Sequence, residues 1–246
     1  MDSRLNKHTA TRPGSLPSDL GSARLPPGQR WRKDLPRFGL LHFAERFPAR
    51  PDLISLRIGG AVRCDIELLS ADFARLPRVQ QTSDFHCVTT WSHAGLRWRG
   101  VRLRDVYEQL ILPMAGPMPD ATTVVMHGQD GARSSLSLAD LLADDVLLAD
   151  GMNEAPLTIA HGAPLRLVAP AHYGYKNVKH LSRLEFRSDM STYRPNSYRF
   201  MDHPRARVAL EERGQWLPGW LLRRLYRPFI TFTAAHFARA LKRHNT

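Results

Sequence analysis

Cysteine is scarce in this chain: Cys64 and Cys87 are the only two among 246 residues. Two cysteines cannot build the disulfide framework of a small secreted domain. The sequence also has neither C-x-x-C nor C-x-x-C-H, which argues against a zinc ribbon and a covalently bound c-type haem. Cys64 lies in an alternating apolar segment, so we expect it to be a packing residue. Cys87 has a different setting, at the end of a predicted strand.

Long apolar runs are absent as well. No run of about 18 apolar residues occurs, so no membrane span is predicted. Residues 1–27 are rich in Ser, Pro and Arg but lack the apolar core and the twin-Arg pair of export signals. The expected location is therefore the cytoplasm. The sequence also has no repeat, no regular βαβ alternation and no glycine-rich nucleotide loop, which leaves a mixed α+β domain as the expected class.

Acidic residues are in deficit. The 35 Lys and Arg residues outnumber the 23 Asp and Glu residues and give a formal net charge of +12. Such a balance suggests an anionic partner, which can be a nucleic acid, a membrane surface, a cofactor or a substrate. Arg dominates over Lys, and its guanidinium group makes paired hydrogen bonds to phosphates and other oxyanions. An Arg-rich composition can equally reflect a solvated surface.

Sequence periodicity predicts many strands and a few short helices. A β-hairpin is expected over residues 53–68, with Gly59-Gly60 at its turn. Further strands are predicted over residues 80–89, 122–126, 146–149, 165–169 and 181–186, with a loop over residues 90–99. Short helices are predicted over residues 70–76, 103–112 and 137–142. We therefore predict a strand-rich α+β fold, with residues 1–30 as a flexible arm, 31–200 as the main domain and 201–246 as a helical tail.

The tail is both basic and apolar. From Glu211 onward, aromatic and aliphatic residues are mixed with Arg, and Pro228 is expected to divide the segment into two helices. One interpretation is that the tail docks on an anionic membrane or on a partner subunit. The other is that its helices pack against their own domain or a sister subunit, with Arg stems covering apolar surface. The second is favoured, and docking through residues 211–246 stays as the alternative.

Cys87 has features of a metal-binding or reactive thiolate. His93 and Arg99 follow it closely, and positive charge favours the thiolate form that binds a soft metal. A lone cysteine on a strand can also be a small buried hydrophobe. Two later blocks, residues 153–170 and 172–179, place His, Arg and Lys near strand ends and Gly-containing loops. Cations and backbone N–H groups in such places can bind a phosphate.

Together these blocks resemble the sulfite oxidase family of molybdopterin-binding oxidoreductases. Residues 87–92, 98–101 and Leu103 are similar to its molybdenum-ligand segment, and residues 146–149, 153–157, 161–168 and 174–179 to its pterin-binding half. Order and separation both agree over about residues 35 to 190. The resemblance implies a sulfite-oxidase-type fold with short helices. It also implies a molybdopterin cofactor without a nucleotide, and oxygen-atom transfer to or from a small substrate.

The resemblance assigns roles to individual residues. Cys87 would be the catalytic thiolate that binds molybdenum. The positions that would bind the cofactor are Arg37, Phe38, His42, His127, His161, Arg166, Asn177, Val178 and Lys179. In the family, the region matching His161, Arg166 and Lys179 holds the pterin phosphate. Asn177 and Val178 would offer backbone groups beside them.

Two departures from the family concern the substrate. Thr89, Thr90 and Trp91 stand where true sulfite oxidases have an Asn and Arg pair in the anion pocket, and Asp150 stands where they have an active-site tyrosine. A carboxylate repels sulfite unless it is protonated or paired. These departures argue against sulfite as the substrate. Asp150 is then a candidate catalytic proton donor or acceptor, with a surface loop position as its alternative.

The sequence thus favours an enzyme over two non-catalytic alternatives. No haem domain is recognisable, so the resemblance implies that electrons are exchanged with a separate donor or acceptor protein. The alternatives are a basic protein that binds nucleic acid and one that binds a membrane surface, because aromatic and basic residues interleave in the tail. No known nucleic-acid-binding motif occurs, so a small-molecule substrate is expected and a nucleic acid is not.

Overall fold

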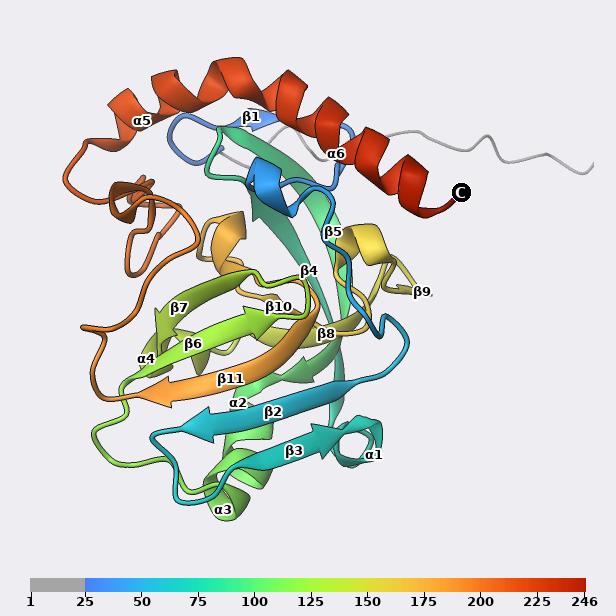
Figure 1. Ribbon diagram of the computed structural model, residues 1–246, viewed down its shortest axis with the longest axis vertical. Helices are drawn as coiled ribbons and strands as arrows, with labels where there is room; N and C mark the ends of the chain where they lie inside the picture. Colours follow the sequence, from blue (N-terminus) through green and yellow to red (C-terminus); the bar gives the residue numbers. More distant parts are fainter. Residues whose placement is uncertain (1–24) are drawn as a thin grey trace, which may run out of the picture.

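Strands dominate the computed structural model, which describes residues 25–246. It contains two mixed sheets and several short helices, and a long helical segment crosses one end of the molecule (Figure 1). One sheet contains β1 (Arg30–Trp31), β4 (Arg78–His86), β5 (Trp91–Arg102), β8 (Leu147–Met152), β9 (Ala155–Pro156) and β10 (Arg166–Val168). The other contains β2 (Ser55–Gly60), β3 (Ile66–Leu69), β6 (Thr123–Gly128), β7 (Arg133–Ser137) and β11 (Leu181–Arg187). The predicted strand-rich α+β fold is confirmed.

The five-stranded sheet carries the larger hydrophobic core. Its order is β3-β2-β11-β6-β7, with β2 and β11 parallel and the other neighbours antiparallel. The hairpin predicted over residues 53–68 is confirmed as β2 and β3, in which Ile58 lies opposite Ile66. The predicted turn at Gly59-Gly60 is wrong, because both glycines belong to β2 and the connection is formed by residues 61–65. Leu56 and Ile58 are fully buried, as the alternation of the sequence predicted.

The six-stranded sheet is built around β5, which pairs with β4, β8 and β1. The predicted loop over residues 90–99 is wrong, because β5 begins at Trp91 and satisfies its backbone groups by pairing with these strands. At Gly100 in this strand, a Cβ atom would lie 2.1 Å from the carbonyl oxygen of Leu148. This glycine therefore marks the close approach of two strands.

Short helices connect the strands. The α-helices before the tail are α1 (Ser70–Phe73), α2 (Leu103–Val106), α3 (Leu112–Met114) and α4 (Leu138–Leu141), and η3 (Tyr107–Ile111) joins α2 to α3. Single turns are η2 (Leu41–Phe43), η4 (Ile159–His161), η5 (Gly174–Lys176) and η6 (Arg199–Met201). The predicted helical segments are confirmed, and the Ser137 hydroxyl caps α4 by accepting a hydrogen bond from the Asp140 N–H. Cys64 is exposed in the connection between β2 and β3, so the prediction that it is a packing residue is wrong: β3 begins only at Ile66.

The tail is helical, as predicted. It forms α5 (Gly219–Tyr226), the single turn η7 (Arg227–Phe229), which contains Pro228, and α6 (Ile230–His244). Its inner face packs on the domain, because Phe237 and Ala240 are buried with Phe43 and Ala44. Within residues 25–246, no helix combines the length and the apolar character needed to span a membrane.

The first described residues lie against the main domain. Arg30 and Trp31 form β1 and pair with the start of β5. Gln29 is buried, although the sequence assigned it to a flexible arm. Most of that predicted arm, residues 1–24, lies outside the described residues.

Candidate active site

Cys87 occupies a tight turn between β4 and β5. Its N–H donates to the Trp91 carbonyl at 2.8 Å, and its own carbonyl accepts from the Thr90 N–H at 3.1 Å. Thr90 has a φ of 83°, which a β-branched residue adopts only where its surroundings hold it. The thiol is 7% exposed, and its sulfur lies 3.1 Å from the Thr89 hydroxyl. The turn therefore fixes the sulfur at the end of a strand.

Segments from both ends of the chain hold this turn. The Gln29 side chain donates to the Cys87 carbonyl at 3.1 Å. The fully buried Arg213 guanidinium donates to the Val88 carbonyl at 2.5 Å and to the Pro27 carbonyl at 2.9 Å. Arg213 also lies over the ring of Tyr173, 5.0 Å from its centroid. These contacts connect the Cys87 turn to residues that precede β1 and to the start of the tail.

The charge state of Cys87 depends on what it binds. Burial raises the pKa of the Cys87 thiol, while the Thr89 hydrogen bonds and the nearby charges of Arg213 and Lys179 lower it. Without a ligand, the thiol is the favoured form. A soft metal ion displaces the proton, because the thiolate is the form that binds metals. In the described part of the chain, no group of three or more His, Cys, Asp or Glu residues could hold a metal.

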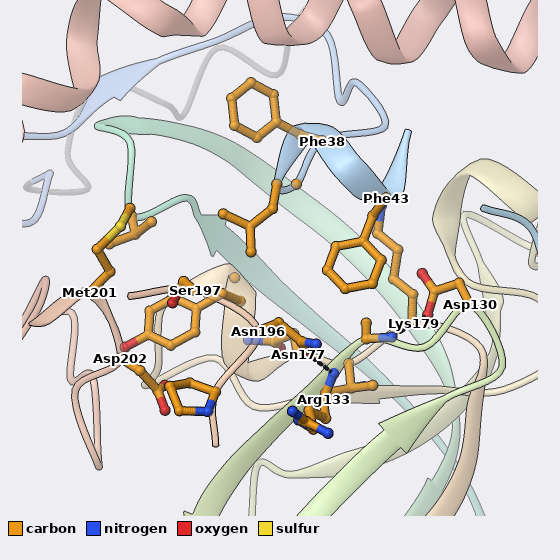
Figure 2. Close-up of a pocket in the computed structure, with 18 of the residues that line it drawn as sticks. Phe38, Phe43, Asp130, Arg133, Asn177, Lys179, Asn196, Ser197, Met201 and Asp202 are labelled. Atoms are coloured by element: carbon orange, nitrogen blue, oxygen red, sulfur yellow. Dashed lines mark hydrogen bonds between the residues drawn. The ribbon is translucent and has the colours of Figure 1, made fainter. Parts of the chain in front are cut away.

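Two adjoining cavities open beside Cys87, with volumes of about 150 and 180 Å³. The first, here the Cys87 cavity, is lined by Cys87, Arg166 and apolar side chains such as Trp91. The second, here the Asn196 cavity, extends from Lys179 and Asp130 to Met201 and Asp202 (Figure 2). Both cavities share the walls Phe38, Gly39, Leu40, Val88, Gly174, Tyr175, Lys179, Met201 and Tyr226, so they form one continuous space.

Buried cations gather at the base of this space. Arg166 donates to the His161 carbonyl at 2.9 Å, and Lys179 donates to the Ala160 carbonyl at 2.9 Å. Gly162 separates the two side chains, since a Cβ atom there would meet the Cβ atoms of Arg166 and Lys179 at 3.0 and 3.2 Å. The turn η4 therefore brings both cations to one place.

Neither Arg166 nor Lys179 forms an ion pair with a described carboxylate, and the charge of Asp130 offsets only part of the shift in the pKa of Lys179. Burial lowers the pKa of Arg166 to about 10, and burial with the Arg166 and Arg37 charges lowers that of Lys179 to about 7. Burial and the Lys179 and Arg166 charges lower the pKa of His161 to about 4. Among the described residues no carboxylate lines the Cys87 cavity, and one guanidinium nitrogen of Arg166, Nη2, has no hydrogen-bond partner. Buried positive charge without a partner is costly, so the site fits an anionic ligand.

Four further predicted residues line the cavities, but their polar groups are largely occupied. Phe38 lines both cavities. Arg37 donates to the carbonyls of residues 43, 44 and 46, which makes it a clamp for the segment that contains η2. The Asn177 side chain bonds to the backbone around Ala169, and the N–H groups of Asn177 and Val178 donate within η5. We therefore assign Arg37, Asn177 and Val178 to the shape of the cavity walls.

Three predicted residues lie elsewhere. His42 is exposed on η2, its ring against that of Phe43. His127 is bonded to Glu185 on β11 at 2.9 Å, and Asp150 on β8 is paired with Arg78 at 2.6 Å and with Arg99 at 3.6 Å. None of the three lines either cavity. The catalytic role of Asp150 stays a prediction: its carboxylate is paired with Arg99 of the adjacent β5 and with Arg78 at the start of β4.

Several residues of the site carried no local signal in the sequence. Arg213 holds the Cys87 turn, and Tyr226 and Phe237 reach the cavities from the inner face of the tail. Asp130 and His180 line the Asn196 cavity. Their common property is that they come from segments distant in sequence, which only the fold brings together. The clustering of Arg and aromatic residues in the tail was the one sequence feature that could have indicated a role of the tail in the site.

Comparison with known proteins identifies this arrangement. Residues 44–194 match the family model described as "Oxidoreductase molybdopterin binding domain". The chain belongs to this family. Its cofactor is accordingly a molybdopterin, and the resemblance seen in the sequence is confirmed.

Individual relatives agree with the family. The chain is 36% identical over 167 residues to the uncharacterized oxidoreductase YuiH of Bacillus subtilis, covering 67% of this chain and 80% of that protein. It is 30% identical over 177 residues to the protein-methionine-sulfoxide reductase catalytic subunit MsrP of Campylobacter jejuni, covering 60% of this chain and 58% of that protein.

A solved structure shows the same fold. The sulfane dehydrogenase SoxCD from Paracoccus pantotrophus aligns with a TM-score of 0.51 and 22% identity, over 83% of this chain and 62% of that one. The chain thus spans somewhat less than two thirds of both the MsrP relative and the SoxCD chain.

Proposed function

We propose that Cys87 is the protein ligand of the molybdenum and that Arg166 and Lys179 bind the pterin phosphate. The buried sulfur at the mouth of the Cys87 turn is a soft donor, as this metal requires. The unpaired Nη2 of Arg166 and the uncompensated charge of Lys179 match an anionic group. His161 is neutral at pH 7 and can donate one hydrogen bond to the same group. The plain pterin, without a nucleotide, is the form that we expect.

We further propose oxygen-atom transfer with a neutral substrate, and favour the reduction of a sulfoxide over the oxidation of sulfite. The observation that carries this proposal is the wall of the Cys87 cavity. Apart from His161, Arg166 and Lys179, the wall is largely apolar and includes Phe38, Phe85, Trp91 and Met201. Residues 87–91 contain no cation, and the cations at the base would be occupied by the cofactor phosphate. A dianion such as sulfite would be desolvated there without compensation, whereas a neutral sulfoxide with apolar substituents fits such a wall.

The proposed reduction of a sulfoxide consumes two electrons, which come from outside the chain. A sulfoxide, two protons and two electrons give a thioether and water. The bound molybdenum centre supplies the oxygen-atom and electron transfer, and the protein binds and orients its reactants. The apolar wall excludes bulk water from the substrate, and the Thr89 hydroxyl keeps its hydrogen bond at the Cys87 sulfur. The electrons come from a separate donor protein.

The first test is cofactor content with matched cysteine variants. Holoprotein from a host that makes the cofactor should contain about one molybdenum and one pterin. Cys87→Ser should lose the metal signal, because a hydroxyl is a poor ligand for a soft metal. Cys64→Ser should keep it, because Cys64 is exposed and remote from the cavities. Wild-type protein without metal and pterin would overturn the assignment.

The second test distinguishes the substrates. Methyl sulfoxides should be reduced with a reduced dye as donor, and sulfite should be oxidised with a kcat/KM at least about tenfold lower, equivalent to 1.4 kcal/mol of transition-state stabilisation. Both activities should vanish in Cys87→Ser. Efficient sulfite oxidation with no sulfoxide reduction would contradict the neutral-substrate proposal and leave the cofactor assignment intact.

A further inference from the structure

The outer side of the tail exposes large apolar side chains. Leu225, Phe229 and Phe232 are 51%, 62% and 54% exposed, and their spacing of four and three residues places them along one side of the helical segment. Trp220 is 50% exposed at the start of α5. The inner side of the same segment is buried, so these residues are not needed for packing within residues 25–246. Exposed apolar residues in contiguous groups mark interaction surfaces.

The same segment carries positive charge only. Residues 213–246 contain seven Lys and Arg residues and no Asp or Glu. Arg224, whose guanidinium lies 5.7 Å from the Trp220 ring, and Arg227 form no ion pair with any described residue. Burial lowers the pKa of Arg227, and so does repulsion from Arg30, Arg223 and other arginines, which shows that these cations are crowded together. An anionic partner would relieve this repulsion.

We propose that the outer surface of α5 and α6 docks on an anionic phospholipid bilayer. An amphipathic helix with Trp, Phe and Leu beside Arg and without carboxylates is the pattern that lies in the membrane interface, with apolar side chains below the headgroups and cations among the phosphates. A folded protein partner would present carboxylates to only one side of the segment, at the rim of the interface. A bilayer offers phosphates along the whole length of the segment. Figure 1 shows α5 and α6 along one end of the molecule, where a flat surface can reach both.

This orientation would place the cofactor close to the membrane. Tyr226 and Phe237, on the inner side of the docking helices, line the cavities. One helix, roughly 10 Å across, therefore separates the cavities from the docking surface. The docking proposal does not depend on the substrate or on the cofactor, so it can fail or hold independently of the proposed function.

Co-sedimentation with vesicles tests the apolar contribution. Purified full-length holoprotein should pellet with vesicles of phosphatidylglycerol and phosphatidylcholine in equal amounts, and at least about tenfold more weakly with phosphatidylcholine alone. Phe229→Ser with Phe232→Ser should weaken binding to the anionic vesicles by about tenfold or more, since the variant lacks two aromatic side chains that the bilayer would bury. The matched control, Leu112→Ser with Met114→Ser, alters similarly exposed residues on α3 at the opposite end of the molecule and should bind as wild type (Figure 1).

Two further variants, which have the same net charge as each other, test the contribution of the cations. Arg224→Gln with Arg239→Gln removes two exposed cations from the docking surface, and Arg75→Gln with Arg183→Gln removes two exposed cations elsewhere. Only the first pair should weaken binding, by about tenfold or more, and should reduce its dependence on salt. Dye-linked activity in solution should be unchanged in all four variants, because none of these residues lines the Cys87 cavity or the Asn196 cavity.

Three outcomes would overturn the proposal. The first is that wild-type protein does not pellet with the anionic vesicles. The second is that each variant of the docking surface binds the anionic vesicles as well as its matched control variant does. The third is self-association, measured by light scattering after gel filtration, that Phe229→Ser with Phe232→Ser abolishes in a protein that does not bind vesicles. That result would assign the surface to a second copy of the chain.

Discussion

Lys179 and Arg166 show how single residues prepare this site for an anion. Each is held by a backbone carbonyl of the same turn, so their positions are fixed before any ligand arrives. Neither has a carboxylate partner, and their mutual repulsion contributes to the lowered pKa of Lys179. The ligand-free site therefore stores unfavourable charge that a bound phosphate would relieve. Folding energy is lost here so that binding energy can be gained.

The pKa of Lys179 gives the ligand-free protein a distinct pH dependence. Its value of about 7 in the folded chain lies below the ordinary value of 10.5. The unfolded chain therefore holds this proton over the interval between the two values, and the stability of the folded protein rises as the pH rises through it. The melting temperature of ligand-free wild type should increase from about pH 7 to about pH 9 relative to that of Lys179→Met.

Other groups also titrate in this interval, so the comparison uses the difference between proteins. Lys242→Met removes an exposed lysine at the end of α6 and should reproduce the wild-type pH dependence. If Lys179→Met follows the wild-type curve, Lys179 has an ordinary pKa and its burial beside Arg166 is relieved in solution.

His127 and Asp150 show why individual roles are harder to predict than the cofactor. The family resemblance assigned His127 to the cofactor and Asp150 to the active site, but they lie on β6 and β8 and line neither cavity. Their partners lie far away in sequence: Glu185 on the adjacent β11 for His127, and Arg99 on the adjacent β5 with Arg78 on β4 for Asp150. A side chain with a strong neighbouring partner is turned toward it and away from the cavity. Only the register of the sheets reveals such pairs.

Among the elements, those with a local pattern were predictable. The β2 and β3 hairpin and the helical run from α2 to α3 followed directly from alternation and helical periodicity. β5 was missed because Gly95 and Gly100 resemble turn residues, although Gly100 serves the close packing of β5 on β8. β7 was missed because its Ser134 and Ser135 are polar, yet both are buried beside β6. Strands that owe their burial to distant neighbours carry little signal of their own.

Helix α6 belongs to the active site as much as to the surface. Phe237 on its inner face stacks on Phe38 with ring centroids 6.5 Å apart, and the Arg37 guanidinium lies 5.0 Å from its ring. It also lines the Asn196 cavity. Phe237→Ala should therefore lower the free energy of unfolding by about 3 kcal/mol and reduce the cofactor content of the purified protein.

Phe232 provides the matched control on the same helix. It is 54% exposed, so Phe232→Ala should change the free energy of unfolding by roughly 0.5 kcal/mol or less and leave the cofactor content unchanged. Denaturant unfolding of the ligand-free proteins and pterin analysis of the holoproteins measure the two effects. Equal stability and equal pterin content in both variants would show that α6 is not part of the site.

At the scale of the whole molecule, the site depends on both ends of the described chain. Pro27, Val88 and Arg213 meet at the Cys87 turn, although 186 residues separate Pro27 from Arg213. The sequence indicated a separate arm, domain and tail, because composition changes at those boundaries. The structure instead uses residues from all three segments to hold the Cys87 turn. A boundary in composition therefore does not mark a boundary in function here.

The net charge of +12 should also control electron exchange. Because the protein is strongly cationic and its cavity is lined by cations, an anionic redox partner is attracted and a cationic one repelled. Dye-linked turnover with an anionic donor, such as reduced anthraquinone disulfonate, should fall several-fold as the ionic strength rises to about 0.2 M, since salt screens the attraction. Turnover with a reduced cationic viologen should rise over the same range, since salt then screens a repulsion. If both dyes respond in the same direction, salt acts on the enzyme itself and the steering argument fails. Opposite responses would support an acidic surface on the electron donor protein that is proposed above.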